Sequence, residues 1–257
     1  MRSTAEVASV LGLIERGLND NEIERRTEIP RSTIRDWRAG KTPRRERGHS
    51  CARRCPRCRH AEHAFQELPG PAYAYLLGLY LGDGCISAGQ RGVWRLRIVL
   101  DRKYPGIIRE CADAMALVMP ANRVGLLDHR HQRSTEVSSW SRSWPCPFPQ
   151  HGPGKKHARP IWLASWQDMI VADHSRELIR GLIHSDGCRS WNTIRHPKKS
   201  YVYPRYLFSN RSDDIRRIFC EACDRLEIHW TVMNATDISI ARRKAIEFMD
   251  EFVGPKR

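Results

Sequence analysis

The sequence predicts an α+β protein made of two similar halves, preceded by a small all-α module. An apolar stretch that ends in Asp-Gly occurs twice, at residues 76–84 and 179–187. The two aspartates, Asp83 and Asp186, are 103 residues apart, which is enough for a whole repeat of helices and strand pairs. The four expected segments are a helical module at 1–42, a basic linker at 43–70, and two halves at 71–175 and 176–257.

The N-terminal module is expected to hold three helices. Apolar residues have helical spacing over 5–16, a second helix follows at 21–28, and Ile29-Pro30 predicts a turn, because proline disfavours helix in the residue before it. The third helix, at 32–38, leaves four residues outward as candidate DNA contacts: Arg31, Thr33, Arg35 and Arg38. This order resembles resolvase-like helix-turn-helix domains, which implies a recognition helix for the DNA major groove. A plain three-helix bundle with a solvated basic face is the alternative.

Each repeated stretch is predicted to be a helix with one nearly bare face. Small residues recur four apart, Gly78 with Gly82 and Gly181 with Ser185, and residues four apart lie on the same face of a helix. Two such faces can pack backbone to backbone. Both helices are expected to end at glycines in the left-handed conformation, namely Gly84 and Gly187.

This pairing would bring Asp83 and Asp186 side by side at two helix C-termini. The helix dipole places partial negative charge there, and the two carboxylates also repel each other, so ionisation of both requires a cation between them. Hard divalent cations such as Mg²⁺ prefer oxygen ligands. The sequence therefore predicts a magnesium site at the ends of the two helices.

Both stretches resemble the signature of LAGLIDADG homing endonucleases. The match is strongest at Gly78, Leu79, Gly82, Asp83, Gly84, Gly181, Leu182, Asp186 and Gly187, and it departs from the motif at the first acidic position, where Leu81 and His184 stand. The resemblance implies a pseudo-twofold duplicated αββαββα fold whose antiparallel sheets form a saddle over double-stranded DNA. It also implies site-specific cleavage of both strands with two or three Mg²⁺ ions, held by Asp83 and Asp186 with Gly82 and Ser185 in the same metal site.

The first half is expected to continue with strands at 85–87, 93–100, 124–129, 136–140 and 161–163 and helices at 102–119 and 165–172. The strand at 93–100 alternates, and Arg95 and Arg97 lie on its basic face as candidate DNA contacts. The long loop at 144–160 carries Lys155 and Lys156, which are candidates for a catalytic role beside the scissile phosphates. An exposed basic loop far from the chemistry is the alternative.

The second half is expected to repeat this order, with strands at about 189–192, 201–208, 231–234 and 238–240 and helices at 212–226 and 244–252. Its candidate DNA contacts are Lys198, Lys199 and Arg205, and Arg242 and Arg243 are further candidates for the catalytic basic group. One chain with two halves needs no second copy, so we expect a monomer with internal pseudo-twofold symmetry.

The linker carries a cysteine pattern typical of zinc sites. Cys55 and Cys58 form Cys-Pro-x-Cys, a turn that places two thiolates on one ion. A structural zinc needs four ligands, so Cys51 and one of the two histidines that follow, His60 and His63, are expected to complete the site, with His63 as the candidate. Surface thiols in a flexible linker are the alternative. The chain's nine cysteines, without a secretory context, favour thiols or metal ligands over disulfides.

The composition indicates a polyanionic partner. The net charge is +15 and the isoelectric point is about 9.8, which favours nucleic acid over a membrane surface. No apolar run approaches the roughly 18 residues of a spanning helix, and the N-terminus lacks signal-peptide features, so we expect a cytoplasmic protein. A DNA-binding transcriptional regulator with a LAGLIDADG-derived fold and no cleavage activity is the alternative to an endonuclease. The fused helix-turn-helix favours the regulator, and the two aspartates favour the enzyme.

Overall fold

The computed structural model describes residues 4–41, 55–59, 63–129, 132–196, 199–254 and 256. The chain divides into two compact units, residues 1–53 and 54–257, and each is described by itself. The predicted zinc ligand Cys51 and the predicted DNA contact Lys198 lie outside the described residues. In the described part of the chain, no helix is both long and apolar enough to cross a bilayer.

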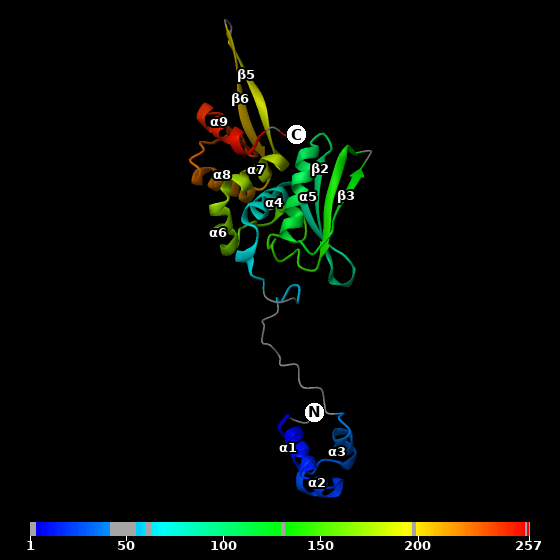
Figure 1. The fold of residues 1–257 in the computed structure, drawn as a ribbon. Helices are drawn as coiled ribbons and strands as arrows, with labels where there is room; N and C mark the ends of the chain where they lie inside the picture. The colour runs from blue at the N-terminus through cyan, green and yellow to red at the C-terminus, as the bar shows by residue number, and fades with distance from the viewer. Residues whose placement is uncertain are drawn as a thin grey trace. The chain divides into compact units, whose positions relative to one another are not determined.

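The first unit holds three helices (Figure 1), with α1 at Thr4–Glu15, α2 at Asp20–Thr27 and α3 at Arg31–Arg38. Asn19 begins α2 with a capping box, because its side chain accepts from the Glu22 amide and the Glu22 carboxylate accepts from the Asn19 amide. The helices enclose a small apolar core made of Val10, Ile23, Ile29, Ile34 and Trp37. The three predicted helices are confirmed to within one residue at each end.

The second unit consists of two repeats of the same seven elements. The first repeat contains α4 (Gly70–Asp83), β1 (Gly84–Ala88), β2 (Trp94–Asp101), α5 (Pro105–Val118), β3 (Val124–His129), β4 (Ser134–Ser141) and α6 (Ser165–Asp173). The second contains α7 (Ser175–Asp186), β5 (Gly187–His196), β6 (Lys199–Ser209), α8 (Asp213–Arg225), β7 (Thr231–Val232), β8 (Asp237–Ile240) and α9 (Arg243–Phe252). The two antiparallel sheets have equivalent strand orders, β1-β2-β4-β3 and β5-β6-β8-β7. The predicted α+β fold with duplicated αββαββα halves is confirmed.

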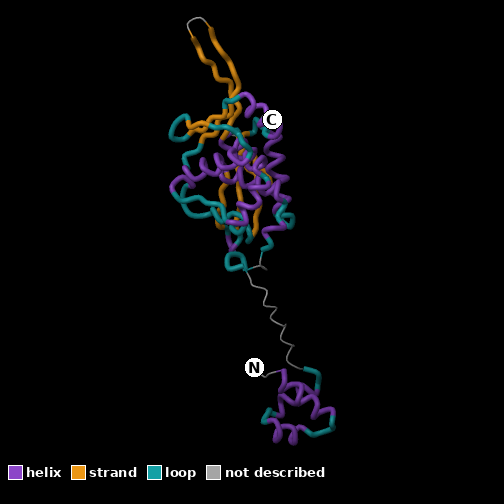
Figure 2. The backbone as a smooth tube through the Cα atoms, turned by 90° about the vertical axis from the view of Figure 1, so that its left-hand side faces the viewer, coloured by secondary structure: helices purple, strands orange, loops and turns teal. Residues whose placement is uncertain are grey.

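Most of the strands predicted from the sequence are confirmed. On β2, Leu96 and Ile98 are buried, whereas Arg95 and Arg97 lie on the opposite, partly exposed face. The hairpin of β5 and β6 is longer than predicted and extends from the body of the second unit (Figures 1 and 2). The strand predicted at 161–163 is wrong, because this segment has no regular structure and the Ile161 amide donates to a side chain, that of Asp214.

The helices α4 and α7 pack through their bare faces at the centre of the second unit. A Cβ atom added at Gly78 would lie 2.6 Å from the Leu178 carbonyl oxygen, and one added at Gly181 would lie 2.2 Å from that of Tyr75. Only glycine fits such a close approach, because the neighbouring atoms are backbone. The predicted backbone-to-backbone packing is confirmed, and it joins the two halves in one apolar core.

The ends of these two helices differ from the prediction. Gly84 (φ −84°, ψ 150°) and Gly187 (φ −119°, ψ 175°) are extended and begin β1 and β5, so neither takes the left-handed conformation. Glycine is needed there for space instead. A Cβ would lie 2.4 Å from Tyr80 Cα at position 84 and 2.8 Å from Ile183 Cα at position 187.

Candidate active site

Asp83 and Asp186 are the last residues of α4 and α7, and the helix packing brings these two ends together. Oδ2 of Asp186 lies 3.0 Å from the place that a Cβ of residue 82 would take. Burial, and then the negative charge of Asp186, raise the pKa of Asp83 to about 6. Burial also raises the pKa of Asp186, against a hydrogen bond from Asn210 Nδ2 at 2.6 Å. The two carboxyl groups therefore interact electrostatically at the paired helix ends.

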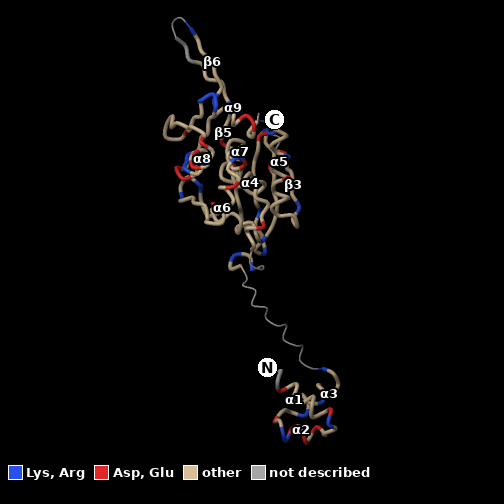
Figure 3. The backbone as a smooth tube through the Cα atoms, turned by 60° about the vertical axis from the view of Figure 1, so that its left-hand side comes forward, with Lys and Arg blue, Asp and Glu red and all other residues tan. Residues whose placement is uncertain are grey.

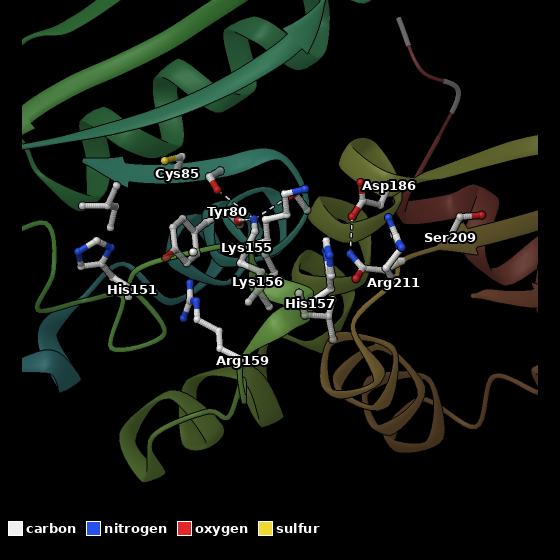
Figure 4. Close-up of a pocket in the computed structure, with 18 residues that line it drawn as sticks. Tyr80, Cys85, His151, Lys155, Lys156, His157, Arg159, Asp186, Ser209 and Arg211 are labelled. Carbon is white, nitrogen blue, oxygen red and sulfur yellow. Dashed lines mark hydrogen bonds between the residues drawn. The ribbon is translucent and has the colours of Figure 1, made fainter. Parts of the chain in front are cut away.

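The two carboxyl groups border different hollows. Asp186 lines a pocket of about 440 Å³ together with Lys156 (Figure 4). Asp83 lines a second pocket, together with Arg102 and Arg133. The first hollow thus combines Asp186 with basic side chains, and the second combines Asp83 and Asp101 with basic side chains.

Lys156, in the loop after β4, lies at the C-terminus of α4. Its ammonium group donates to the carbonyl oxygens of Tyr80 (2.5 Å), Gly82 (2.7 Å) and Gly84 (2.9 Å), at a place where the helix itself provides few donors. Burial lowers the pKa of Lys156 to about 8, although the two aspartates favour its charged form. Lys156 therefore joins the loop to the site and neutralises part of its negative charge.

Lys155, the other predicted catalytic lysine, is exposed, which makes the pair a matched test. Lys156→Met is expected to lower the free energy of unfolding by about 1–3 kcal/mol, because three carbonyl groups lose a charged donor. Lys155→Met, one residue away, is expected to change it by less than about 0.5 kcal/mol. Chemical denaturation of both variants measures the difference. Equal effects would show that Lys156 does not hold the helix end.

A second lysine, Lys256, lies at the C-terminus of α7, and it belongs to no motif that would single it out. Its ammonium group donates to the His184 carbonyl oxygen at 2.9 Å. Burial lowers its pKa, and the strongest opposing charge is that of Asp83. Arg180 Nη1 donates to the Phe252 carbonyl oxygen at 2.5 Å and so holds the end of α9 against α7. The C-terminal ends of α4 and α7 thus each carry one aspartate and one lysine.

Two side chains of the α7 signature serve the packing of the helix. His184 is buried, and its Nε2 donates to the Val253 carbonyl oxygen at 3.2 Å while Nδ1 accepts from the Tyr75 hydroxyl at 3.0 Å. Burial lowers its pKa to about 4, so the imidazole is neutral at pH 7. Ser185, a predicted member of the metal site, donates from Oγ to the Gly181 carbonyl oxygen at 3.0 Å. Its hydroxyl therefore bonds mainly within its own helix, and it reaches the Gly78 carbonyl oxygen of α4 at 3.5 Å.

The predicted DNA contacts of the first sheet share a buried acid. Glu136 on β4 is 4% exposed and forms ion pairs with Arg95 and, at 3.9 Å, with Arg97. The positive charge of this face is therefore partly compensated within the sheet. On the second sheet, Arg205 Nη1 lies 3.6 Å from a methionine sulfur, and Lys199 Nζ lies 5.0 Å from the centre of a tyrosine ring.

The other predicted basic residues are spread over the surface of the two units. In the first unit, Arg31 and Arg38 form ion pairs within the module at 3.1 and 2.9 Å, whereas Arg35 is exposed and Thr33 is partly exposed. In the second unit, Arg242 and Arg243 lie at the start of α9, where Arg243 pairs with a glutamate of the same helix.

No protein-family model matches the chain, and no curated protein matches its sequence. Among solved structures, it is similar to I-DmoI in complex with DNA and Mn, with a TM-score of 0.46 and 15% identity over 72% of this chain and 97% of that one. It is also similar to the LAGLIDADG meganuclease I-AabMI bound to uncleaved DNA, with a TM-score of 0.44 and 12% identity over 70% and 84% of the two chains. A third similar structure is full-length DUF199/WhiA from Thermatoga maritima, with a TM-score of 0.45 and 14% identity over 73% of this chain but only 56% of that protein. At these values the likeness concerns the path of the backbone and carries no argument about activity.

Proposed function

We propose that this chain is a LAGLIDADG-type homing endonuclease, which cuts both strands of double-stranded DNA. Asp83 and Asp186 would be its catalytic residues, and Mg²⁺ its metal ion. The likeness to solved endonucleases is distant and does not carry the proposal. What supports it is the convergence of two carboxyl groups at the ends of two packed helices, where the charge of one raises the pKa of the other. Such a pair costs stability in a protein without a cation, and perturbed carboxyl groups of this kind cluster at functional sites.

The donor set fits a hard divalent cation. Asp83 and Asp186 would hold the ion through carboxylate oxygens, and the two helix dipoles add partial negative charge at the same place. Bound Mg²⁺ would supply Lewis-acid stabilisation of the phosphodiester and a water of lowered pKa. Lys156 and Lys256 place two ammonium groups beside the carboxylates, where they can neutralise charge on a phosphate.

The proposed substrate is DNA because the net charge is +15 and Lys and Arg occur on both units (Figure 3). In the first unit, α3 with its exposed Arg35 would enter the major groove. In the second, the β5–β6 hairpin carries Trp191, which is 66% exposed. We propose that four basic residues of the two sheets contact phosphates: Arg95, Arg97, Lys199 and Arg205. The same role is proposed for Lys198, which lies outside the described residues. Affinity is then expected to fall steeply with salt.

A randomised duplex library tests the proposal directly. With Mg²⁺, the full chain is expected to cut a defined subset of sequences on both strands, and with a chelator it is expected to bind DNA without cutting. Sequencing of the new ends gives the target and the stagger between the two cuts. Tight binding without a metal-dependent cut in any sequence would contradict the endonuclease.

A transcriptional regulator is the second candidate, and the two lysines favour it. Lys156 already binds the Gly82 carbonyl oxygen, and two ammonium groups partly compensate the two carboxylates, so the helix ends have partners without a metal. A helix-turn-helix module suits a protein that reads promoter DNA. In the library experiment, a regulator would retain specific sequences and leave them free of nicks, with or without Mg²⁺.

A further inference from the structure

A second group of metal-binding side chains lies outside the candidate active site. The ligand atoms of Cys55, Cys58, His63 and Cys146 all lie within 4.8 Å of one another. The first three residues precede α4, whereas Cys146 lies in the long loop after β4. We propose that these four residues bind a structural zinc ion, which fastens the segment before α4 to that loop. This zinc site is independent of the proposed DNA cleavage.

The distances suit a tetrahedral zinc ion. The sulfur atoms of Cys55 and Cys146 are 3.6 Å apart, close to the roughly 3.8 Å between two thiolates that each lie about 2.3 Å from a tetrahedral ion. Cys58 Sγ and His63 Nε2 are 3.1 Å apart, somewhat less than the roughly 3.6 Å expected for a sulfur and a nitrogen ligand. Since a disulfide needs about 2.05 Å between sulfurs, Cys55 and Cys146 are two free thiols. Three cysteines and one histidine form a common donor set for structural zinc.

Neighbouring hydrogen bonds hold both sides of this cluster in place. The Arg59 amide donates to the Cys55 carbonyl oxygen at 2.8 Å and closes the Cys-Pro-Arg-Cys turn. Arg57 Nη1 donates to the Pro145 carbonyl oxygen at 2.7 Å, directly beside Cys146 in the chain. Cys146 is 6% exposed, so a thiolate there has little water around it. A bound Zn²⁺, with the Arg57 guanidinium nearby, would supply the balancing positive charge.

The proposed fourth zinc ligand is thus Cys146. The ligand predicted from the sequence was Cys51, which lies outside the described residues. Cys146 comes 88 residues after Cys58, and only the fold brings the two together. The loop that contains Cys146 also contains Lys156, whose ammonium group is bonded to the end of α4. Zinc would therefore fix one end of this loop, and the bonds of Lys156 fix the other.

Metal analysis of the purified full chain tests the assignment. We expect about one zinc per chain, loss of most of it in Cys146→Ser, and retention in Cys51→Ser. Cys188→Ser is the matched control, because Cys188 is an exposed free thiol on β5 and the change should leave the zinc content intact. Less than about half an equivalent of zinc in the natural chain, or full zinc in Cys146→Ser, would overturn the proposal.

Cobalt substitution of the unmutated chain keeps the test decisive if Cys146→Ser fails to fold. Tetrahedral Co²⁺ with three thiolate ligands is expected to give strong visible ligand-field bands and a thiolate-to-metal charge-transfer band. A cobalt spectrum without thiolate charge transfer would contradict the site. So would a disulfide between Cys55 and Cys146, found by peptide mass mapping of the chain purified without reductant.

Discussion

Gly181→Ala is expected to lower the free energy of unfolding of the second unit by about 3 kcal/mol or more. The added Cβ would lie 2.2 Å from the Tyr75 carbonyl oxygen and 3.0 Å from Gly78 Cα, so α4 and α7 must move apart to admit one methyl group. Both helices are enclosed by core side chains, so this movement disturbs the packing of both halves. Thermal denaturation is expected to show a midpoint lower by roughly 6–12 °C.

Gly125→Ala is the matched control for this substitution. Gly125 lies on β3, and its added Cβ would be 3.8 Å from the Ser138 carbonyl oxygen, an ordinary van der Waals contact. The expected change is under about 1 kcal/mol, and its favourable part comes from the lower backbone freedom of alanine in the unfolded chain. Equal thermal unfolding midpoints for Gly181→Ala and Gly125→Ala would contradict the close approach of α4 and α7.

The paired helices and the repeat could be predicted because short-range patterns carry them. Gly78 and Gly181 each have a small residue four positions on, and this spacing defines a bare helix face without any knowledge of the partner. The alternation of Leu96 and Ile98 with arginines likewise defines the two faces of β2. The left-handed ends at Gly84 and Gly187 were a wrong prediction, because a glycine after a helix can serve a tight contact as well as a turn.

The polar partners of the site could not be predicted, because they come from distant parts of the chain. Lys256 and Cys146 stand in no motif, and only the fold brings the first to the end of α7 and the second to Cys55. Lys155 and Lys156 could not be told apart in the sequence. Lys155 has an extended backbone (φ −77°, ψ 142°) and precedes a short 3₁₀ helix at Lys156–Ala158. Lys155 remains exposed, whereas Lys156 reaches the end of α4.

Asp83→Asn and Asp186→Asn are each expected to reduce the rate of DNA cleavage by about 100- to 1,000-fold or more, if the chain is an endonuclease. Asparagine keeps the shape of the side chain and removes the charge that holds a divalent cation. DNA affinity is expected to stay within about threefold, since the basic surface is unchanged. Asp113→Asn makes the same change on the exposed side of α5 and serves as the control. Cleavage at the unmutated rate in both site variants would contradict the assignment of the two aspartates.

The pH dependence of stability tests the same site without a DNA target. The pKa of Asp83 is raised from 3.8 to about 6, so without metal the folded chain binds this proton more tightly than the unfolded chain. The contribution of Asp83 to stability is therefore fully present below about pH 4 and is lost as the pH rises through about 6. Asp83→Asn escapes this loss and should be the more stable protein at neutral pH.

Mg²⁺ should reverse that order, because it binds only the ionised pair and protects the unmutated chain. Thermal melts of both proteins across this pH range, with and without Mg²⁺, measure which of the two is more stable under each condition. If Mg²⁺ stabilised neither protein at any pH, the carboxylates would rely on protein groups such as Lys156, Lys256 and Asn210 without a metal, and the regulator would be the better assignment.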